Sequence, residues 1–200
     1  MIDMIIEDIQ TALKNEAYIA ALSLVVILPD ICGKAEYPDI HKGSIRYKKW
    51  FDEYIGQYEK SPFDSQDIYE NPHLSGEVMY QLRCSFLHEG NPNVDKDKIE
   101  EESCKIDKFI IEIEKEKEFH VMGSSSSVTW GINEPVFRKF RLNLRDLCFK
   151  VTGVAKFYYE NNKEKFSFFN YEFVDIDKEL EMFKKMQGIN RSYSNEPNPI

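Results

Sequence analysis

Apolar residues at helical spacing mark the first half of the chain as helical. In the segment 4–28, Ile5, Ile9 and Leu13 recur every four positions, and the residues after them are almost wholly apolar. A stripe of this kind that widens into a continuous apolar run is typical of a helix entering a core. The pattern predicts one long helix over this segment, disrupted at Pro29 and Gly33.

Two further helices follow the loop after Gly33. The segment 44–60 carries aromatic residues along one broad face, and the segment 75–90 begins at a good N-cap, Ser75, and ends at a good C-terminal stop, Gly90. The buried face predicted for this third helix consists of Leu74, Val78, Met79, Leu82 and Phe86.

The second half of the chain mixes two periods. Alternation between residues 107 and 131 predicts a β-hairpin that turns in the charged run "EKEKE", a further strand in "SVTWG" and a flexible connector in "SSSS" (124–127). Apolar spacing of three and four then predicts a long helix from about Pro135 to Tyr158, and "KELEMFKKMQG" (178–188) predicts a short one. The fold class is therefore mainly α, with a helical bundle in a single domain (1–187), a small β insertion at about 107–131 and a disordered tail at 188–200.

The charge balance restricts the partners of such a domain. The formal net charge is -9 and the isoelectric point is about 5.1, so a polyanion is repelled unless it meets a local basic patch. Arg138, Arg141 and Arg145 share one side of the predicted long helix, and Arg46 lies in a second basic cluster. We expect these four arginines to contact RNA phosphates. The alternative is an ordinary solvated face paired with carboxylates.

The sequence lacks the signatures of metal and nucleotide sites. The cysteines (Cys32, Cys84, Cys104, Cys148) form no CxxC pair, and no HExxH, GxGxxG or Walker pattern occurs. We therefore expect no metal and no cofactor. Scattered cysteines indicate reduced thiols and a cytoplasmic location. The longest apolar run, 18–29, is too short to span a bilayer, so we expect no membrane insertion.

The stretch "LRCSFLHEG" carries the candidate chemistry. Arg83 and His88 stand at the end of the third predicted helix, where the helix dipole favours a protonated histidine. A guanidinium suits a phosphodiester, and a histidine suits general acid–base catalysis. The alternative is a solvated arginine with a histidine that closes the helix. At about 100° per residue the two positions lie about 140° apart. To meet at a common phosphate, Arg83 must reach around the helix, the last turn must unwind, or a second helix must supply the partner residue.

The phrase "MYQLRCSFLHEGN" resembles the signature of HEPN domains, small α-helical proteins whose hallmark is R-x4-6-H. The upstream "ALSLVVILPDICGKAEYPD" and "RYKKWFDEY" are similar to a bacterial subgroup of the family, so the resemblance covers residues 17–90 and, more loosely, the later long helix. In active members a dimer unites two Arg/His pairs into a site that cleaves RNA without metal. The resemblance implies a homodimer in which Arg83 holds the scissile phosphate and His88 acts as base or acid.

The same resemblance leaves two functions open. One is a metal-independent endoribonuclease, a toxin of a toxin–antitoxin pair or a phage-defence component with a neighbouring-gene partner. The other is a non-catalytic module that dimerises or binds RNA, nucleotide or protein. Cys84 bears on this choice, because it follows the motif arginine where many active members carry Asn, Asp or His. The sequence names neither the substrate RNA nor any antitoxin.

Overall fold

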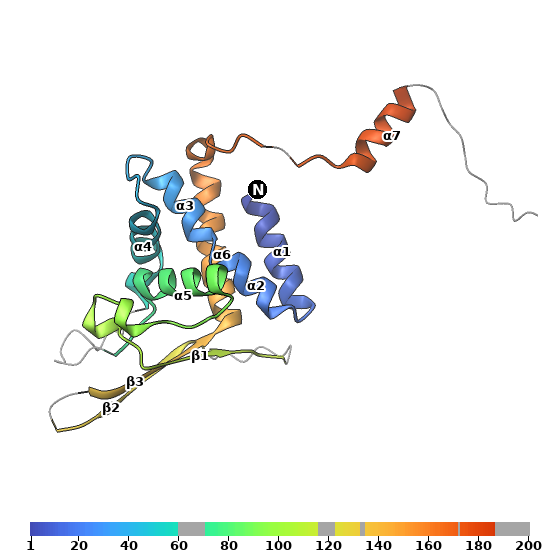
Figure 1. The fold of residues 1–200 in the computed structure, drawn as a ribbon. Coiled ribbons are helices and arrows are strands. Elements are labelled where there is room, and N and C mark those ends of the chain that lie inside the picture. The colour runs from blue at the N-terminus through green and yellow to red at the C-terminus, as the bar shows by residue number, and fades with distance from the viewer. Residues whose placement is uncertain (60–70, 116–122, 133–134, 172, 187–200) are drawn as a thin grey trace, which may run out of the picture. The chain divides into compact units, whose positions relative to one another are not determined.

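The computed structural model describes residues 1–59, 71–115, 123–132, 135–171 and 173–186. It divides the chain into two compact units, Met1–Phe166 and Ser167–Ile200. The first unit combines helices with a three-stranded sheet, so the predicted mainly α class is confirmed (Figure 1). Its α-helices are α1 (Ile2–Lys14), α2 (Tyr18–Val25), α3 (Leu28–Glu36), α4 (Gly43–Tyr54), α5 (Gly76–Glu89) and α6 (Leu144–Asn161). Its 3-10 helices are η1 (Gly56–Tyr58), η2 (Lys96–Lys98), η3 (Glu102–Cys104) and η4 (Lys163–Phe166), and its strands are β1 (Lys108–Glu112), β2 (Ser125–Trp130) and β3 (Pro135–Asn143).

The single long helix predicted over 4–28 is wrong, because the chain turns twice there. Glu16 takes a left-handed backbone conformation (φ 58°) and separates α1 from α2. A turn at 26–27 separates α2 from α3. Pro29 lies in the first turn of α3, where its missing N–H costs no hydrogen bond, so this proline begins a helix instead of ending one.

The third predicted helix is confirmed as α5. The Ser75 hydroxyl accepts a hydrogen bond from the Val78 amide, and Gly90 closes the helix in the left-handed conformation (φ 67°). All five residues predicted for its buried face are buried. Two glycines bring the helices close together. A Cβ on Gly33 of α3 would lie 2.8 Å from the Arg46 carbonyl oxygen of α4, and a Cβ on Gly76 of α5 would lie 2.3 Å from the Lys48 carbonyl oxygen.

The sheet contains a pairing of β1 with β3 that the sequence did not predict. Its strand order is β1-β3-β2, with β1 parallel and β2 antiparallel to β3. The hairpin among the described residues is β2–β3. β1 corresponds to the first strand of the predicted hairpin, and residues 116–122, which carry most of its turn and its return strand, lie outside the described residues. Residues 125–127, predicted as part of a connector, belong to β2.

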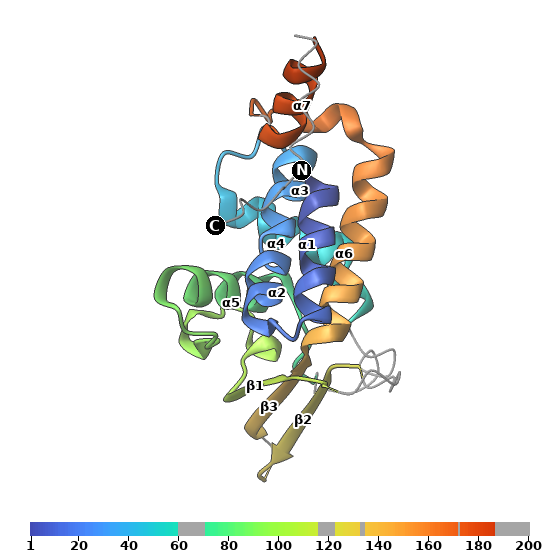
Figure 2. The same cartoon turned by 90° about the vertical axis from the view of Figure 1, so that its right-hand side faces the viewer.

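The long helix predicted from Pro135 begins only at Leu144. The preceding residues form β3, in which Phe140 and Leu142 are buried with the period of two that a strand requires. The apolar spacing misled because strand and helix follow each other directly. Asn143 ends β3 and also caps α6, since its side-chain oxygen accepts from the Asp146 amide at 3.0 Å. Figure 2 shows β3 leading into α6 without a loop.

One stretch of the described residues, Tyr18–Glu36, has the length and composition of a membrane span. It comprises α2 and α3 with the turn between them, and half of its most apolar window is buried inside the unit. Core helices pass the same test, so this finding is weak evidence for a membrane segment.

The second unit contains α7 (Ile176–Met186), which confirms the predicted short helix with a start two residues earlier. Every described side chain of α7 is exposed. The predicted disordered tail at 188–200 lies outside the described residues.

Candidate functional site

Arg83 and His88 touch each other within one chain. Nη1 of Arg83 lies 2.9 Å from Nε2 of His88. Of the three arrangements that the sequence left open, the structure shows the one in which Arg83 reaches around the helix to His88. The helical angle fixes only the directions in which side chains leave the backbone, and an arginine side chain is long enough to reach around the last turn. Because a guanidinium only donates, Nε2 of His88 must accept, which places the proton of the neutral imidazole on Nδ1.

Asp30 of α3 holds Arg83 from the other side. Nε of Arg83 donates to Oδ2 of Asp30 across 2.9 Å, and both side chains are less than one-third exposed. Burial raises the pKa of the Asp30 carboxyl more than the charge and hydrogen bond of Arg83 and the charge of Arg46 lower it. Burial opposes the charge of Arg83, but the Asp30 carboxylate outweighs this effect and raises the pKa of the guanidinium. The result is a chain of polar contacts, Asp30–Arg83–His88, that ties α3 to α5.

Arg46 of α4 belongs to the same corner of the unit. Its charge is near enough to Asp30 to oppose the rise in the pKa of that carboxyl. Its Nη1 donates to the Ile40 carbonyl oxygen at 3.0 Å. The close approach at Gly33 is what permits this placement, because it presses the Arg46 backbone against α3. Of the four arginines predicted to contact RNA, Arg46 is thus the one that lies beside the Arg83–His88 pair.

Tyr47, Tyr80 and Cys84 lie near Arg83. Tyr47 is fully buried, and its hydroxyl donates to the Val26 carbonyl oxygen at 3.0 Å. The Tyr80 ring meets Tyr47 edge to face with ring centroids 5.4 Å apart. Burial, followed by a hydrogen bond with Cys84, raises the pKa of Tyr80. The thiol after the motif arginine is therefore engaged with its own helix, one turn back.

Sequence reasoning missed Asp30 and Tyr80. Tyr80 carried a usable signal, because residues three apart on a helix are neighbours and Tyr80 precedes Arg83 by three. Asp30 carried none, since it lies 53 residues from Arg83 and only the packing of α3 against α5 joins them.

The predicted arginine ladder does not exist as one surface. Arg138 and Arg141 lie on β3, where a spacing of three places them on opposite faces of the sheet, and Arg145 lies on α6. The prediction failed because it assumed a helical period over residues that form a strand.

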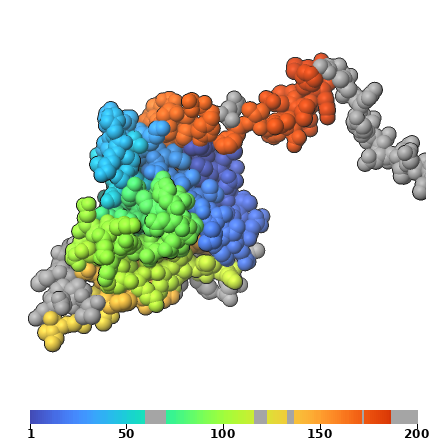
Figure 3. Space-filling model, viewed as in Figure 1, coloured from blue at the N-terminus to red at the C-terminus, as the bar shows by residue number. Residues whose placement is uncertain are grey.

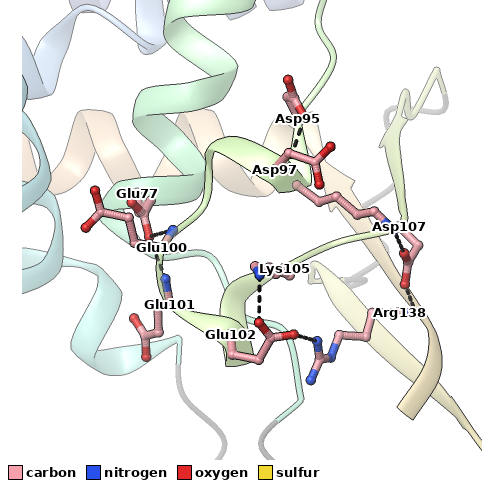
Figure 4. Close-up of polar contacts among 10 residues, drawn as sticks. Glu77, Asp95, Asp97, Glu100, Glu101, Glu102, Lys105, Asp107 and Arg138 are labelled. Carbon is pink, nitrogen blue, oxygen red and sulfur yellow. Dashed lines mark hydrogen bonds and ion pairs between the residues drawn. The ribbon is translucent and has the colours of Figure 1, made fainter.

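Each arginine of the predicted ladder has a partner within the chain. Nη1 of Arg138 contacts the Glu102 carboxylate at 3.4 Å, and Arg141 pairs with the Glu112 carboxylate. Nη2 of Arg145 donates to the Glu114 carbonyl oxygen at 3.3 Å. The Arg138 contact belongs to a wider set of polar contacts that fastens the segment before β1 (Figure 4).

The segment before β1 also contacts a carboxylate that is almost completely buried. Glu77 of α5 is 9% exposed and accepts from Lys48 at 2.9 Å. It also accepts from the backbone amides of Glu100 and Glu101 at 3.0 and 3.2 Å (Figure 4). Burial raises the pKa of Glu77, but these hydrogen bonds outweigh it and hold the pKa below its usual value. Glu77 therefore anchors the loop that follows α5.

The Arg83–His88 corner is open to solvent at its outer end, since His88 and Glu89 are exposed. In the space-filling view, α5 and the segment after it lie at the surface of the first unit, beside the blue helices (Figure 3). Among the described residues no group of three His, Cys, Asp or Glu side chains is placed to hold a metal ion.

Comparison with known proteins adds no relative to this picture. No protein-family model matches the chain, and neither a curated protein nor a solved structure matches it significantly.

Proposed function

We propose that the chain is a metal-independent endoribonuclease of the HEPN type, with Arg83 and His88 as its catalytic pair. The observation that carries the proposal is the 2.9 Å contact between Nη1 of Arg83 and Nε2 of His88 at a solvent-exposed helix end. A cation that binds phosphate and a group that moves protons are thereby within reach of one phosphodiester.

The protonation pattern of the pair suits the first step of RNA cleavage. Nε2 of His88 faces Nη1 of Arg83. When a phosphate oxygen takes the place of Nε2 as the acceptor at Nη1, the lone pair of Nε2 becomes free to accept a proton beside the bound phosphate. In the proposed reaction this nitrogen takes the proton of the ribose 2′-hydroxyl while the 2′-oxygen attacks phosphorus. The bond to the 5′-oxygen breaks, the leaving oxygen takes a proton from solvent water, and a 2′,3′-cyclic phosphate and a 5′-hydroxyl remain.

Asp30 has a positioning role in this scheme. Its contact at Nε and the His88 contact at Nη1 engage two of the five N–H donors of the guanidinium. Arg46 adds a second positive charge beside the pair and helps to offset the acidic surface of the chain. In this scheme the RNA phosphate meets two arginines, one of which is shared with the Asp30 carboxylate.

A second function is favoured by the same ion pair. The Asp30 carboxylate neutralises Arg83 and joins α3 to α5, which is what a purely structural salt bridge does. On this reading the chain is a non-catalytic module that dimerises or binds RNA, nucleotide or protein.

Cleavage of RNA in EDTA by the purified chain separates the two functions. The endoribonuclease produces fragments with cyclic phosphate ends, and both Arg83→Lys and His88→Gln abolish them while the variants keep the wild-type circular dichroism spectrum. Wild-type protein that leaves RNA intact at micromolar concentration over hours contradicts the catalytic proposal.

The resemblance to HEPN proteins also carries the proposal that the chain forms a homodimer and acts in the cytoplasm as a toxin or phage-defence component. The contact between Arg83 and His88 within one chain removes the geometric reason for a second helix. Dimerisation therefore rests on the resemblance alone.

A further inference from the structure

The sheet has one face turned away from the buried side chains of β3. Phe140 and Leu142 are buried on one side, so the residues between and before them, Phe137, Lys139 and Arg141, lie on the other. Register places Lys108, Ile110 and Glu112 of β1, and Ser125, Ser127 and Thr129 of β2, on that same outer face. We call this set of side chains the outer sheet face.

The charge on the outer sheet face is positive although the whole chain is acidic. Lys108 and Lys139 are direct register partners in the parallel β1–β3 pair. Like charges placed directly opposite each other destabilise a sheet, so this pair is a cost to folding. Among the described residues neither lysine has an ion-pair partner, whereas Arg141 pairs with Glu112. Three cations against one carboxylate give this face a net positive charge on a chain of net charge -9.

Hydroxyl groups and an aromatic ring stand beside these charges. Ser125, Ser127 and Thr129 are exposed and lie opposite Arg141, Lys139 and Phe137 on the neighbouring strand. Phe137 is 41% exposed. Hydroxyls and lysines are frequent donors to phosphate oxygens, and exposed aromatic rings stack on unpaired bases. Among nucleic acids, only a single-stranded one offers both a phosphate backbone and base faces that are free to stack.

We infer that the outer sheet face binds a single-stranded segment of RNA. This inference rests on the proposed function for its ligand class, and it adds a second contact region that lies on elements other than those of the Arg83–His88 pair. Lys108 and Lys139 hold consecutive phosphates, the hydroxyls of β2 donate to the same backbone, and Phe137 stacks on a base.

The test measures binding apart from cleavage. The full chain is titrated against a fluorescein-labelled 2′-O-methyl RNA 12-mer, which lacks the attacking hydroxyl, and fluorescence anisotropy is recorded from 50 to 300 mM NaCl. Lys108→Glu with Lys139→Glu is compared with Lys156→Glu with Lys163→Glu, which makes the same charge change at exposed positions of α6 and η4. Phe137→Ala forms a third arm.

The sheet double variant is expected to bind at least tenfold more weakly, and its salt slope should fall by about 1.4, since each phosphate contact on a single strand contributes about 0.7. Phe137→Ala should lose about fivefold or more from stacking. The control double variant should lose less than threefold. Equal losses in both double variants, an unchanged slope, or no binding by wild type would overturn the inference.

Competitors decide the class of ligand. The inference requires that an unlabelled single strand displaces the probe and that a duplex of the same length or poly-glutamate displaces it at least tenfold less well. Equal displacement by poly-glutamate would assign the face to acidic proteins instead. Binding that survives while no RNA is cleaved would leave this inference standing and refute the endoribonuclease. Cleavage that survives in a sheet variant with wild-type affinity would do the reverse.

Discussion

Asp30 and Arg83 are joined by a hydrogen-bonded ion pair of 2.9 Å between helices α3 and α5. The pair connects a residue next to the Pro29 turn with the motif arginine, and it sets the direction from which the guanidinium meets His88. The position of Arg83 is therefore a property of how two helices pack and not of α5 alone.

Removing the Asp30 charge should separate positioning from stability. Asp30→Asn is expected to lower the kcat of RNA cleavage at least tenfold, because Arg83 loses the partner that orients it. The free energy of unfolding should change by no more than about 1 kcal/mol, since partly exposed ion pairs contribute little. Single-turnover cleavage and urea unfolding give the two numbers. A variant with wild-type kcat would remove Asp30 from the site.

The pH dependence of stability offers a second check on Asp30. Its folded-state pKa is raised, so its contribution favours folding at low pH and is lost as pH rises through that folded value. Asp30→Asn should remove this pH-dependent contribution. The difference in stability, variant minus wild type, should therefore be larger above the folded-state pKa of Asp30 than below it. Melting temperatures from pH 4 to 8 measure the difference.

Glu77 should behave in the opposite way. Its pKa is lowered, so its contribution is present above the ordinary glutamate pKa and is lost as pH falls through the folded value. Glu77→Gln should cost about 2 kcal/mol at pH 7, because hydrogen bonds to a charged group are worth about 1.5–3 kcal/mol. Its deficit should shrink between about pH 5 and pH 3. A deficit that stays constant over this range would show that the charge of Glu77 is immaterial.

Two glycines make a matched pair for packing. A Cβ at Gly76 would lie 2.3 Å from the Lys48 carbonyl oxygen and 2.9 Å from the Asp52 carboxylate, so Gly76→Ala should destabilise the chain by about 3 kcal/mol. Gly153, in the interior of α6, has open space around it, and Gly153→Ala should stabilise the chain by about 0.5–1 kcal/mol. Thermal or urea unfolding of both variants would test the close contact of α5 with α4, and equal effects would contradict it.

Dimerisation needs a test at a residue that is accessible. Ser85 is unsuitable because it is 5% exposed and its hydroxyl donates to the Gln81 carbonyl oxygen. Leu87 lies between Arg83 and His88 and is 37% exposed. If two copies pair through this helix, Leu87→Glu should convert a dimer to a monomer and reduce cleavage at least tenfold, as measured by sedimentation velocity and by activity on dilution. A monomeric wild type that still cleaves RNA would exclude the composite site.

The parts of the fold that the sequence predicted are those with local causes. Ser75 and Gly90 bound α5 correctly because capping acts within one turn. The Arg83–His88 pair was singled out from its spacing and from the resemblance to the HEPN signature, both of which lie within one short stretch of sequence. Asp30 was missed because its role depends on a contact 53 residues away in sequence.

The errors arose where two local rules compete. Phe137, Phe140 and Leu144 fit a helical spacing, but Phe140 and Leu142 fit a strand equally well, and pairing with β1 and β2 decides between them. The arginine ladder failed with that choice. Pro29 was interpreted as a helix end because a proline in the first turn and one after the last turn look alike without knowledge of the turn at 26–27.

Asn143 has a mechanical consequence for the unit. It is the last residue of β3 and the N-cap of α6, and it is 4% exposed. Its backbone N–H donates to the Ser124 hydroxyl at 3.2 Å. A joint without a loop and with its polar groups engaged has no residue that can act as a hinge. We therefore expect β3 and the 18-residue helix α6 to move as one rigid body, so that a change in the tilt of the sheet also moves the far end of the helix.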